Sequence, residues 1–114
     1  MFVFTQEQVD RLARATFFRN LEERIEAVEG EPADLTPAQR AALWAAASDA
    51  ARYGIVSIGA CLALCHIYWE LGLDCIQKIP AMAAILADEQ AGETQKIEAL
   101  WSVRTALLAA LKGA

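Results

Sequence analysis

The chain has 114 residues, a length typical of a single domain. Ten Lys and Arg residues against fifteen Asp and Glu residues give a formal charge of −5, which argues against a nucleic-acid partner because phosphate binding requires a clustered basic face. Hydrophobic residues make up 56% of the chain and charged residues 22%, so the composition excludes intrinsic disorder and suggests more apolar surface than one small domain easily buries.

The amino-terminal residues and the cysteines bear on the cellular compartment. Residues 1–4 (Met-Phe-Val-Phe) are too short for the apolar region of a secretory signal and follow no basic stretch. Three cysteines, an odd number, are more typical of a reducing cytosol than of an oxidising compartment. We therefore expect a cytoplasmic protein.

The first predicted helix covers about residues 6–29. Thr5 and Gln8 have the spacing of a capping box, and Phe4 and Val9 have that of a hydrophobic staple. Glycine and proline follow the helix and end it. Apolar residues recur inside it at steps of three and four, which predicts one apolar face made of Val9, Leu12, Ala13, Phe17, Leu21 and Val28.

The second predicted helix covers residues 37–52 and is rich in alanine, the best helix former. Thr36 and Gln39 repeat the capping-box spacing, and Pro37 occupies the first helical position, where its missing N–H costs nothing. Gly54 suits the left-handed position after the helix. The buried side is expected to contain Leu43, Trp44, Ala47 and Ala51.

The third predicted helix starts after Ser57, a candidate cap, and runs to about Leu71. No charged residue occurs between residues 53 and 69, and apolar residues lie on every side. A helix that is hydrophobic all round is either buried centrally or spans a membrane. These seventeen residues lie at the lower edge of the roughly 20 that a span needs, and Ser57, His66 and the lack of flanking basic residues favour a central core helix.

Two further helices are expected at about 80–90 and 94–111, after a connector at 74–80. Pro80 opens the fourth helix, and the fifth shows helical spacing of Ile97, Leu100, Trp101, Arg104, Leu108 and Leu111. No segment alternates convincingly with the period of a strand. The sequence therefore predicts one all-α domain over residues 1–114, a compact five-helix bundle around the central apolar helix.

Cysteines and the single histidine are the candidates for chemistry. Cys61 and Cys65 lie one turn apart and could bind a metal ion with Cys75, but structural zinc sites pair cysteines across a turn, so we favour packing. His66 and Glu70, at i and i+4, are either a catalytic pair or a buried polar seam. No phosphate loop or nucleophile elbow accompanies them, so we expect no catalytic residue, cofactor or metal ion.

Small residues in the third predicted helix bear on the oligomeric state. Gly59 and Ala63 lie one turn apart and would let another helix approach closely. In a soluble protein this spacing mostly indicates tight core packing, and it leaves a homodimer as an alternative.

Acidic residues are concentrated in residues 22–34, which contain six of them and one arginine and so carry the whole formal charge of −5. Several fall in the last turns of the first helix, where the macrodipole disfavours each by roughly 0.3–1 kcal/mol. They form either a solvated face or a docking patch for a basic partner. Phe18, at the margin of the apolar stripe, is either a core-edge residue or a partner contact. The candidate partner-binding residues are Phe18, Glu22, Glu26 and Glu29.

Short motifs along the chain carry a family resemblance. They are Arg-Tyr-Gly-Ile at 52–55, Leu-Gly-Leu-Asp at 71–74, Pro80, Ile-Leu-Ala-Asp at 85–88 and Arg-Ala-Thr-Phe-Phe at 14–18. With these motifs the chain resembles small helical proteins encoded beside effectors and adaptor chaperones of bacterial type VI secretion systems. Cys75 departs from that pattern, which has an aromatic residue there.

The resemblance implies a non-enzymatic accessory, a co-chaperone or adaptor partner that keeps an effector or its loading chaperone competent before export. An apolar helical groove would cover exposed effector segments. The alternatives are an immunity protein that blocks a co-encoded toxin with its acidic face and, third, a small enzyme that uses His66 and Glu70.

Overall fold

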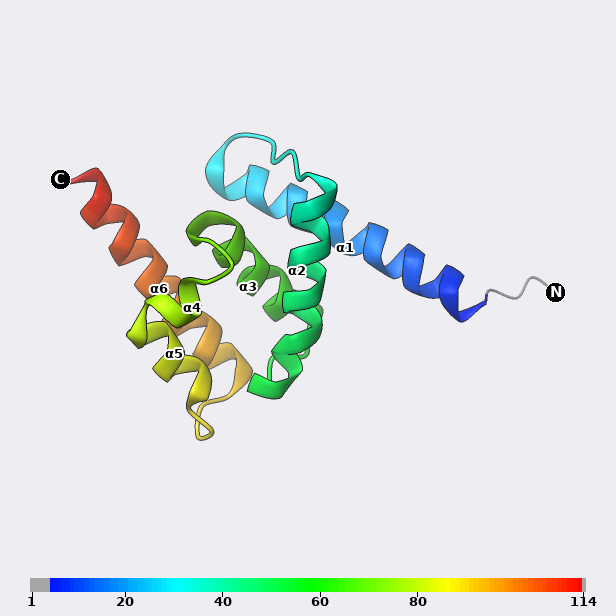
Figure 1. Cartoon of the computed structure of the whole chain (residues 1–114). Coiled ribbons are helices and arrows are strands. Elements are labelled where there is room, and N and C mark those ends of the chain that lie inside the picture. The colour runs from blue at the N-terminus through cyan, green and yellow to red at the C-terminus, as the bar shows by residue number, and fades with distance from the viewer. Residues whose placement is uncertain (1–4, 114) are drawn as a thin grey trace.

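The computed structural model describes residues 5–113, and within them the chain forms α-helices and one 3₁₀ helix but no β-strand (Figure 1). The all-α class predicted from the periodicity is therefore confirmed. In chain order the elements are α1 (Gln6–Glu29), α2 (Pro37–Asp49), the 3₁₀ helix η1 (Ala50–Tyr53), α3 (Ile58–Leu71), α4 (Cys75–Lys78), α5 (Pro80–Ala87) and α6 (Glu93–Lys112).

Both predicted capping boxes form, and they fix where α1 and α2 begin. The Thr5 hydroxyl accepts the Gln8 N–H at 3.2 Å while the Gln8 side chain accepts the Thr5 N–H at 2.8 Å. Thr36 and Gln39 make the same reciprocal pair at 3.1 and 2.9 Å. The predicted staple between Phe4 and Val9 involves a residue outside the described part of the chain.

The end of α2 is tighter than predicted. The α-helix stops at Asp49, and residues 50–53 continue as η1 rather than as one helix to residue 52. Gly54 has the expected left-handed conformation, with φ of 78°, and donates its N–H to Ala51. The N–H of Ile55 then bonds to the carbonyl of Ala50, and Ile55 is buried. This turn sets the direction in which the chain enters α3.

Helix α3 packs against α1, α2 and α6. Ser57 caps it as predicted, accepting the N–H of Ala60, and all six residues of the run 63–68 are buried, whereas Ile58 and Gly59 at its start are exposed. Within residues 5–113 we find no helix that is both long enough and apolar enough to cross a bilayer. The close helix packing expected at Gly59 is absent: a Cβ added there would meet no atom of residues 5–113 within 4 Å, so no helix of this range packs closely against it.

The second half of the chain is more broken than predicted. The expected connector contains the short helix α4, and α5 ends at Ala87 instead of about residue 90. Asp88 accounts for this end, because its backbone is extended and its carboxylate accepts the N–H of Gln90 at 2.9 Å, a turn that competes with the helix.

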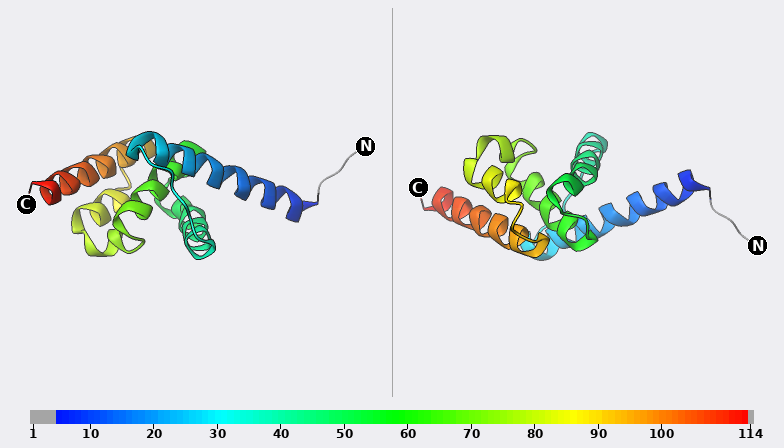
Figure 2. Two further views of the ribbon diagram at one scale, coloured as in Figure 1. Left: turned by 90° about the horizontal axis from the view of Figure 1, so that it is seen from above. Right: turned by 90° about the horizontal axis from the view of Figure 1, so that it is seen from below.

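The two terminal helices extend past the rest of the molecule, in opposite directions (Figures 1 and 2). Every residue from 5 to 16 is exposed, as is every residue from 109 to 113. The molecule consequently measures 58 × 35 × 21 Å. A helix of 24 residues is about 36 Å long at 1.5 Å per residue, so α1 extends beyond the helices that pack against it.

Candidate binding groove

An apolar groove runs along α1 where this helix leaves the body. Its outer part has a volume of about 450 Å³, and a second hollow of about 170 Å³ continues it towards the start of α3. The two hollows share Phe17, Trp44 and Ile58, so we treat them as one groove, the α1 groove. Its lining is Val9, Leu12, Ala13, Thr16, Phe17, Asn20, Trp44, Ala47, Ser48, Val56, Ile58 and Cys61.

The α1 wall of the groove consists largely of residues from the predicted apolar face of the first helix. Val9 and Leu12 belong to the apolar stripe of the first helix, yet Leu12 remains 54% exposed and Val9 is also exposed. Val28, at the other end of the stripe, is exposed too. The apolar stripe is therefore buried only in part, because periodicity shows which face is apolar but not where the neighbouring helices end.

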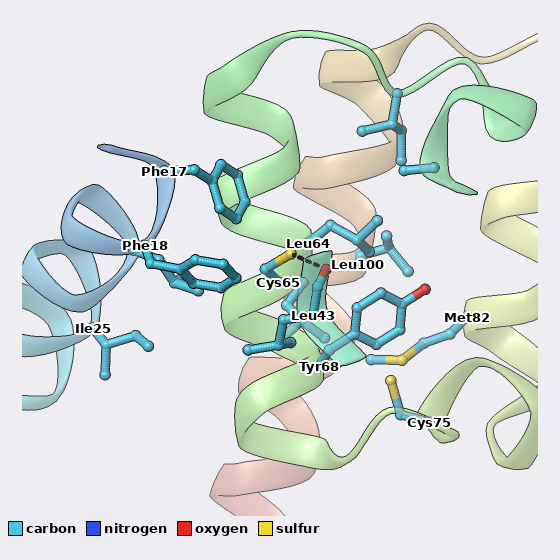
Figure 3. Packing of buried hydrophobic residues seen from close by; sticks show 14 of the residues in the cluster. Phe17, Phe18, Ile25, Leu43, Leu64, Cys65, Tyr68, Cys75, Met82 and Leu100 are labelled. Atoms are coloured by element: carbon cyan, nitrogen blue, oxygen red, sulfur yellow. Dashed lines mark hydrogen bonds between the residues drawn. The ribbon is translucent and has the colours of Figure 1, made fainter. Parts of the chain in front are cut away.

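Aromatic side chains form the floor at the point where α1 enters the body. The rings of Phe17 and Trp44 are 5.5 Å apart and edge-on, and Phe17 meets Phe18 in the same way at 5.4 Å. Both phenylalanines point from α1 towards α3 (Figure 3). Phe18 is only 2% exposed, so it is a core residue and offers no surface to a partner. The prediction that Phe18 contacts a partner was therefore wrong, and the alternative of a core residue is confirmed.

The opposite wall is the segment that leads into α3. Val56 and Ile58 are 70% and 68% exposed, unusually high for aliphatic residues beside an apolar hollow. Glu93, the first residue of α6, fixes this segment by accepting the N–H groups of Val56 and Ser57, each at 2.7 Å. These backbone bonds lower the pKa of Glu93. The wall is thus held rigid although its side chains face solvent.

The acidic residues predicted to bind a partner are divided between internal and external roles. Glu22 pairs with Arg40 at 2.7 Å, and Glu29 pairs with Arg104 at 2.9 Å. Glu26 is exposed and makes no ion pair among residues 5–113. A partner-binding role for these carboxylates stays a prediction, and two of the three already neutralise arginines of the same chain.

A buried polar cluster surrounds the single histidine, whose side chain is 0% exposed. Nε2 of His66 lies 3.1 Å from Glu29, and among the described residues it makes no hydrogen bond to Glu70, the partner that the i,i+4 spacing predicts. Glu70 instead forms a bidentate pair with Arg104, which also bonds to Glu29. The predicted His66–Glu70 pair is therefore replaced by a network that joins α1, α3 and α6.

Burial and charge set the protonation of this cluster. Burial lowers the pKa of His66, against the raising effect of its hydrogen bond to Glu29. Burial is the largest influence on the pKa of Glu70 and would raise it, but the hydrogen bonds with Arg104 and Glu29 and the charges of Arg104 and His66 together outweigh burial, and the pKa is lowered. Arg24 lies over Trp101, 5.2 Å from the ring centroid. Two carboxylates and two guanidinium groups thus lie around His66, and this balance of charge suits a neutral imidazole.

Metal binding is the other chemistry that this cluster could support. Ligand atoms of Glu29, His66 and Glu70 all lie within 4.8 Å of one another, the one such group in the described part of the chain. The guanidinium of Arg104 already donates to both carboxylates and occupies the place of a cation, so a metal ion would have to displace it.

The cysteines pack as small apolar residues rather than as a ligand set. Cys65 and Cys75 are buried, and the Cys65 thiol donates to the carbonyl of Leu43 at 3.6 Å (Figure 3). Burial raises the pKa of Cys65 to about 12, which keeps the thiol protonated and unreactive. The Cys61 thiol faces the carbonyl of Ile55 at 3.9 Å.

Comparison of the chain with protein-family models, with curated proteins and with solved structures found no match.

Proposed function

We propose that this protein is a non-enzymatic accessory that binds an apolar segment of a protein partner in the α1 groove. The observation that carries the proposal is the exposure of Val9, Leu12, Val56 and Ile58 around one hollow. Contiguous exposed apolar surface of this kind marks interaction sites, and a groove between helices suits an amphipathic helix. The burial of His66 away from solvent supports binding rather than catalysis.

The groove suits a reversible complex. Covering the exposed parts of its four aliphatic side chains supplies on the order of 5 kcal/mol, because a fully buried Val, Leu or Ile contributes about 1.5–3 kcal/mol. Association costs consume a large share of that sum. An accessory that must later release its client needs such moderate affinity.

The partner class comes from the sequence resemblance. We propose that the partner is an effector of a type VI secretion system, or the adaptor chaperone that loads it, and that binding takes place in the cytoplasm before export. Shielding an apolar segment of the client would keep it soluble and competent for loading.

Co-expression and co-purification with a type VI secretion effector and with an adaptor chaperone from the same bacterium test the proposal. We expect a complex with one of the two, and we expect Leu12→Asp and Ile58→Asp to abolish it, because each places a charge on an apolar wall of the groove. Leu111→Asp is the matched control, since Leu111 is exposed on α6 away from the groove. A complex that survives both groove substitutions, or no complex with either protein, would contradict the proposal.

An immunity role is the second candidate, and the exposed carboxylates Glu23 and Glu26 favour it. An immunity protein would protect cells from the co-encoded toxin without changing the amount of effector. An accessory would change the amount or the export of the effector and give no protection.

A further inference from the structure

Two arginines beside the α1 groove lack acidic partners. Between residues 11 and 20, α1 contains Arg11, Arg14 and Arg19 and no acidic residue, although the chain as a whole has a charge of −5. Arg11 pairs with Glu7 at 3.1 Å. Arg14 and Arg19 make no ion pair with any residue of the described range 5–113.

Arg14 borders the apolar floor, and Arg19 borders the outer wall of the groove on α1. The guanidinium carbon of Arg14 lies 5.6 Å from the centroid of the Trp44 ring, which lines the groove. Arg19 lies three residues after Thr16 and seven after Leu12, so it continues the row that these two lining residues form on α1, on the side of the helix away from Phe17. Arg14 and Arg19 are exposed, so their charges are available to whatever occupies the groove.

The acidic groups nearest to the groove are already engaged. Glu7 pairs with Arg11, and the carboxylate of Asp10 accepts a hydrogen bond from Gln6 at 2.8 Å. On the opposite wall, the carboxylate of Glu93 is occupied by two backbone N–H groups. Asp10 and Glu93 keep their negative charges in these hydrogen bonds, because the donors are neutral. Among the charged residues named here, Arg14 is the one whose charged group lies against the lining of the groove, over Trp44.

We propose that the occupant of the α1 groove is an amphipathic segment of the partner that carries acidic residues along the border of its apolar face. This inference rests on the proposed function and adds the charge of the ligand to it. Apolar contacts with Leu12, Trp44 and Ile58 hold the segment, and Arg14 and Arg19 select acidic over basic partners. The partner side of this contact is thus opposite in charge to the one expected from the acidic residues 22–34.

The acidic segment of a second copy fits the groove poorly. Ile25, the largest apolar residue of that segment, is fully buried in its own core, and Val28 is the exposed aliphatic residue there. Glu22 and Glu29 are held by Arg40 and Arg104. Residues 22–34 therefore offer one exposed aliphatic side chain and no full set of free carboxylates, so we expect a different protein to supply the ligand.

Three synthetic helical peptides test the inference by fluorescence anisotropy. They share one apolar face of leucines and carry Glu, Gln or Lys at all flanking positions. At low ionic strength we expect the Glu peptide to bind about ten-fold more tightly than the Gln peptide and the Lys peptide to bind most weakly, because two charge pairs form in the first case and two repulsions in the last. Added salt should reduce the difference.

Variants assign the selectivity to the two arginines. Arg14→Gln combined with Arg19→Gln should remove the preference for the Glu peptide while binding of the Gln peptide persists, and Lys112→Gln, an exposed residue of α6, should change nothing. Equal binding of the three peptides, or preference for the Lys peptide, would overturn the acidic ligand and leave the groove intact as a binding site. Failure of every peptide to bind would overturn the groove as well.

Sedimentation velocity of the wild type without peptide tests whether a second copy of the chain occupies the groove. We expect a monomer at all concentrations. A concentration-dependent dimer that Leu12→Glu abolishes would assign the groove to a second copy and contradict the proposal.

Discussion

At the scale of single residues, the cluster around His66 shows how a helical protein accommodates charge between packed helices. Glu29, Glu70 and Arg104 come from three helices, and Arg104 bonds to both carboxylates. Nε of Arg24 and Nδ1 of His66 are buried and make no hydrogen bond within residues 5–113. A neutral ring tolerates this better than an imidazolium, whose second N–H would need an acceptor.

Acid should therefore destabilise the fold through His66. Burial lowers the pKa of His66 in the folded state below its value near 6.5 in the unfolded chain. The stability that the neutral His66 contributes to the fold is therefore complete above pH 6.5 and is lost as the pH falls through the pKa of the folded state. Besides Glu29, the ring is influenced by Glu70, whose charge raises its pKa, and by Arg24, whose charge lowers it. Arg104 bonds to the same two carboxylates, and Trp69 and Trp101 pack against the ring. We expect the free energy of unfolding in urea to fall between pH 6.5 and 5, by at most about 1.4 kcal/mol per pH unit for one proton.

His66→Gln is the control for this expectation, because its amide can still donate to Glu29 and does not titrate. The difference in slope between wild type and variant isolates the histidine from the carboxylates, which titrate in both. Parallel curves from pH 8 to 5 would show that His66 is not the group responsible.

At the scale of elements, Lys96 joins two helix ends that the sequence does not connect. Its Nζ donates to the carbonyl of Tyr53, at the end of η1, and to that of Leu86, near the end of α5, both at 2.8 Å. A cation is favourable at the carboxyl end of a helix, and one lysine from α6 serves two. Within its own helix Lys96 looks like any surface lysine, so no local pattern distinguishes it.

Lys96→Met should destabilise the protein by about 2–4 kcal/mol, since it keeps the apolar stem but removes two charge-assisted hydrogen bonds from a buried site. Chemical denaturation followed by circular dichroism measures the loss. Lys112→Met, in the exposed last turn of α6, should cost less than about 0.5 kcal/mol. A similar loss of unfolding free energy in the two variants would contradict the proposed bridge between η1 and α5.

The elements themselves were largely predictable, because their ends are set by residues a few positions apart. The capping boxes at Thr5 and Thr36 and the left-handed turn at Gly54 depend on local geometry, and the structure contains all three. The partners in the His66 cluster, by contrast, are separated by 37 and 34 positions in the chain. Such pairs depend on how the helices pack, which spacing within one helix cannot show.

At the scale of the whole molecule, the groove exists because α1 is longer than the body. The radius of gyration is 15.2 Å, compared with about 13 Å for a compact chain of this length. The turns of α1 at residues 6–16 have no covering helix, and isolated helices this short are marginal in water. A bound segment would bury part of these turns and stabilise them.

Hydrogen exchange should distinguish the uncovered turns of α1 from the turns of the same helix that pack in the core. We expect the backbone amides at residues 9–16 to open at a cost of about 1 kcal/mol or less, and those at 18–25 to be far better protected because Phe18, Leu21 and Ile25 are buried. Adding the acidic peptide should protect the first set and leave the second unchanged. Uniform protection along α1 in the free protein would contradict the expectation.

The separation of the overhanging turns from the core has an evolutionary consequence. Substitutions at positions 5–16 alter an exposed surface, so we expect them to change the free energy of unfolding little. If the α1 groove binds a partner as proposed, changes in about three turns of helix would alter the choice of ligand and leave the packed body as it is.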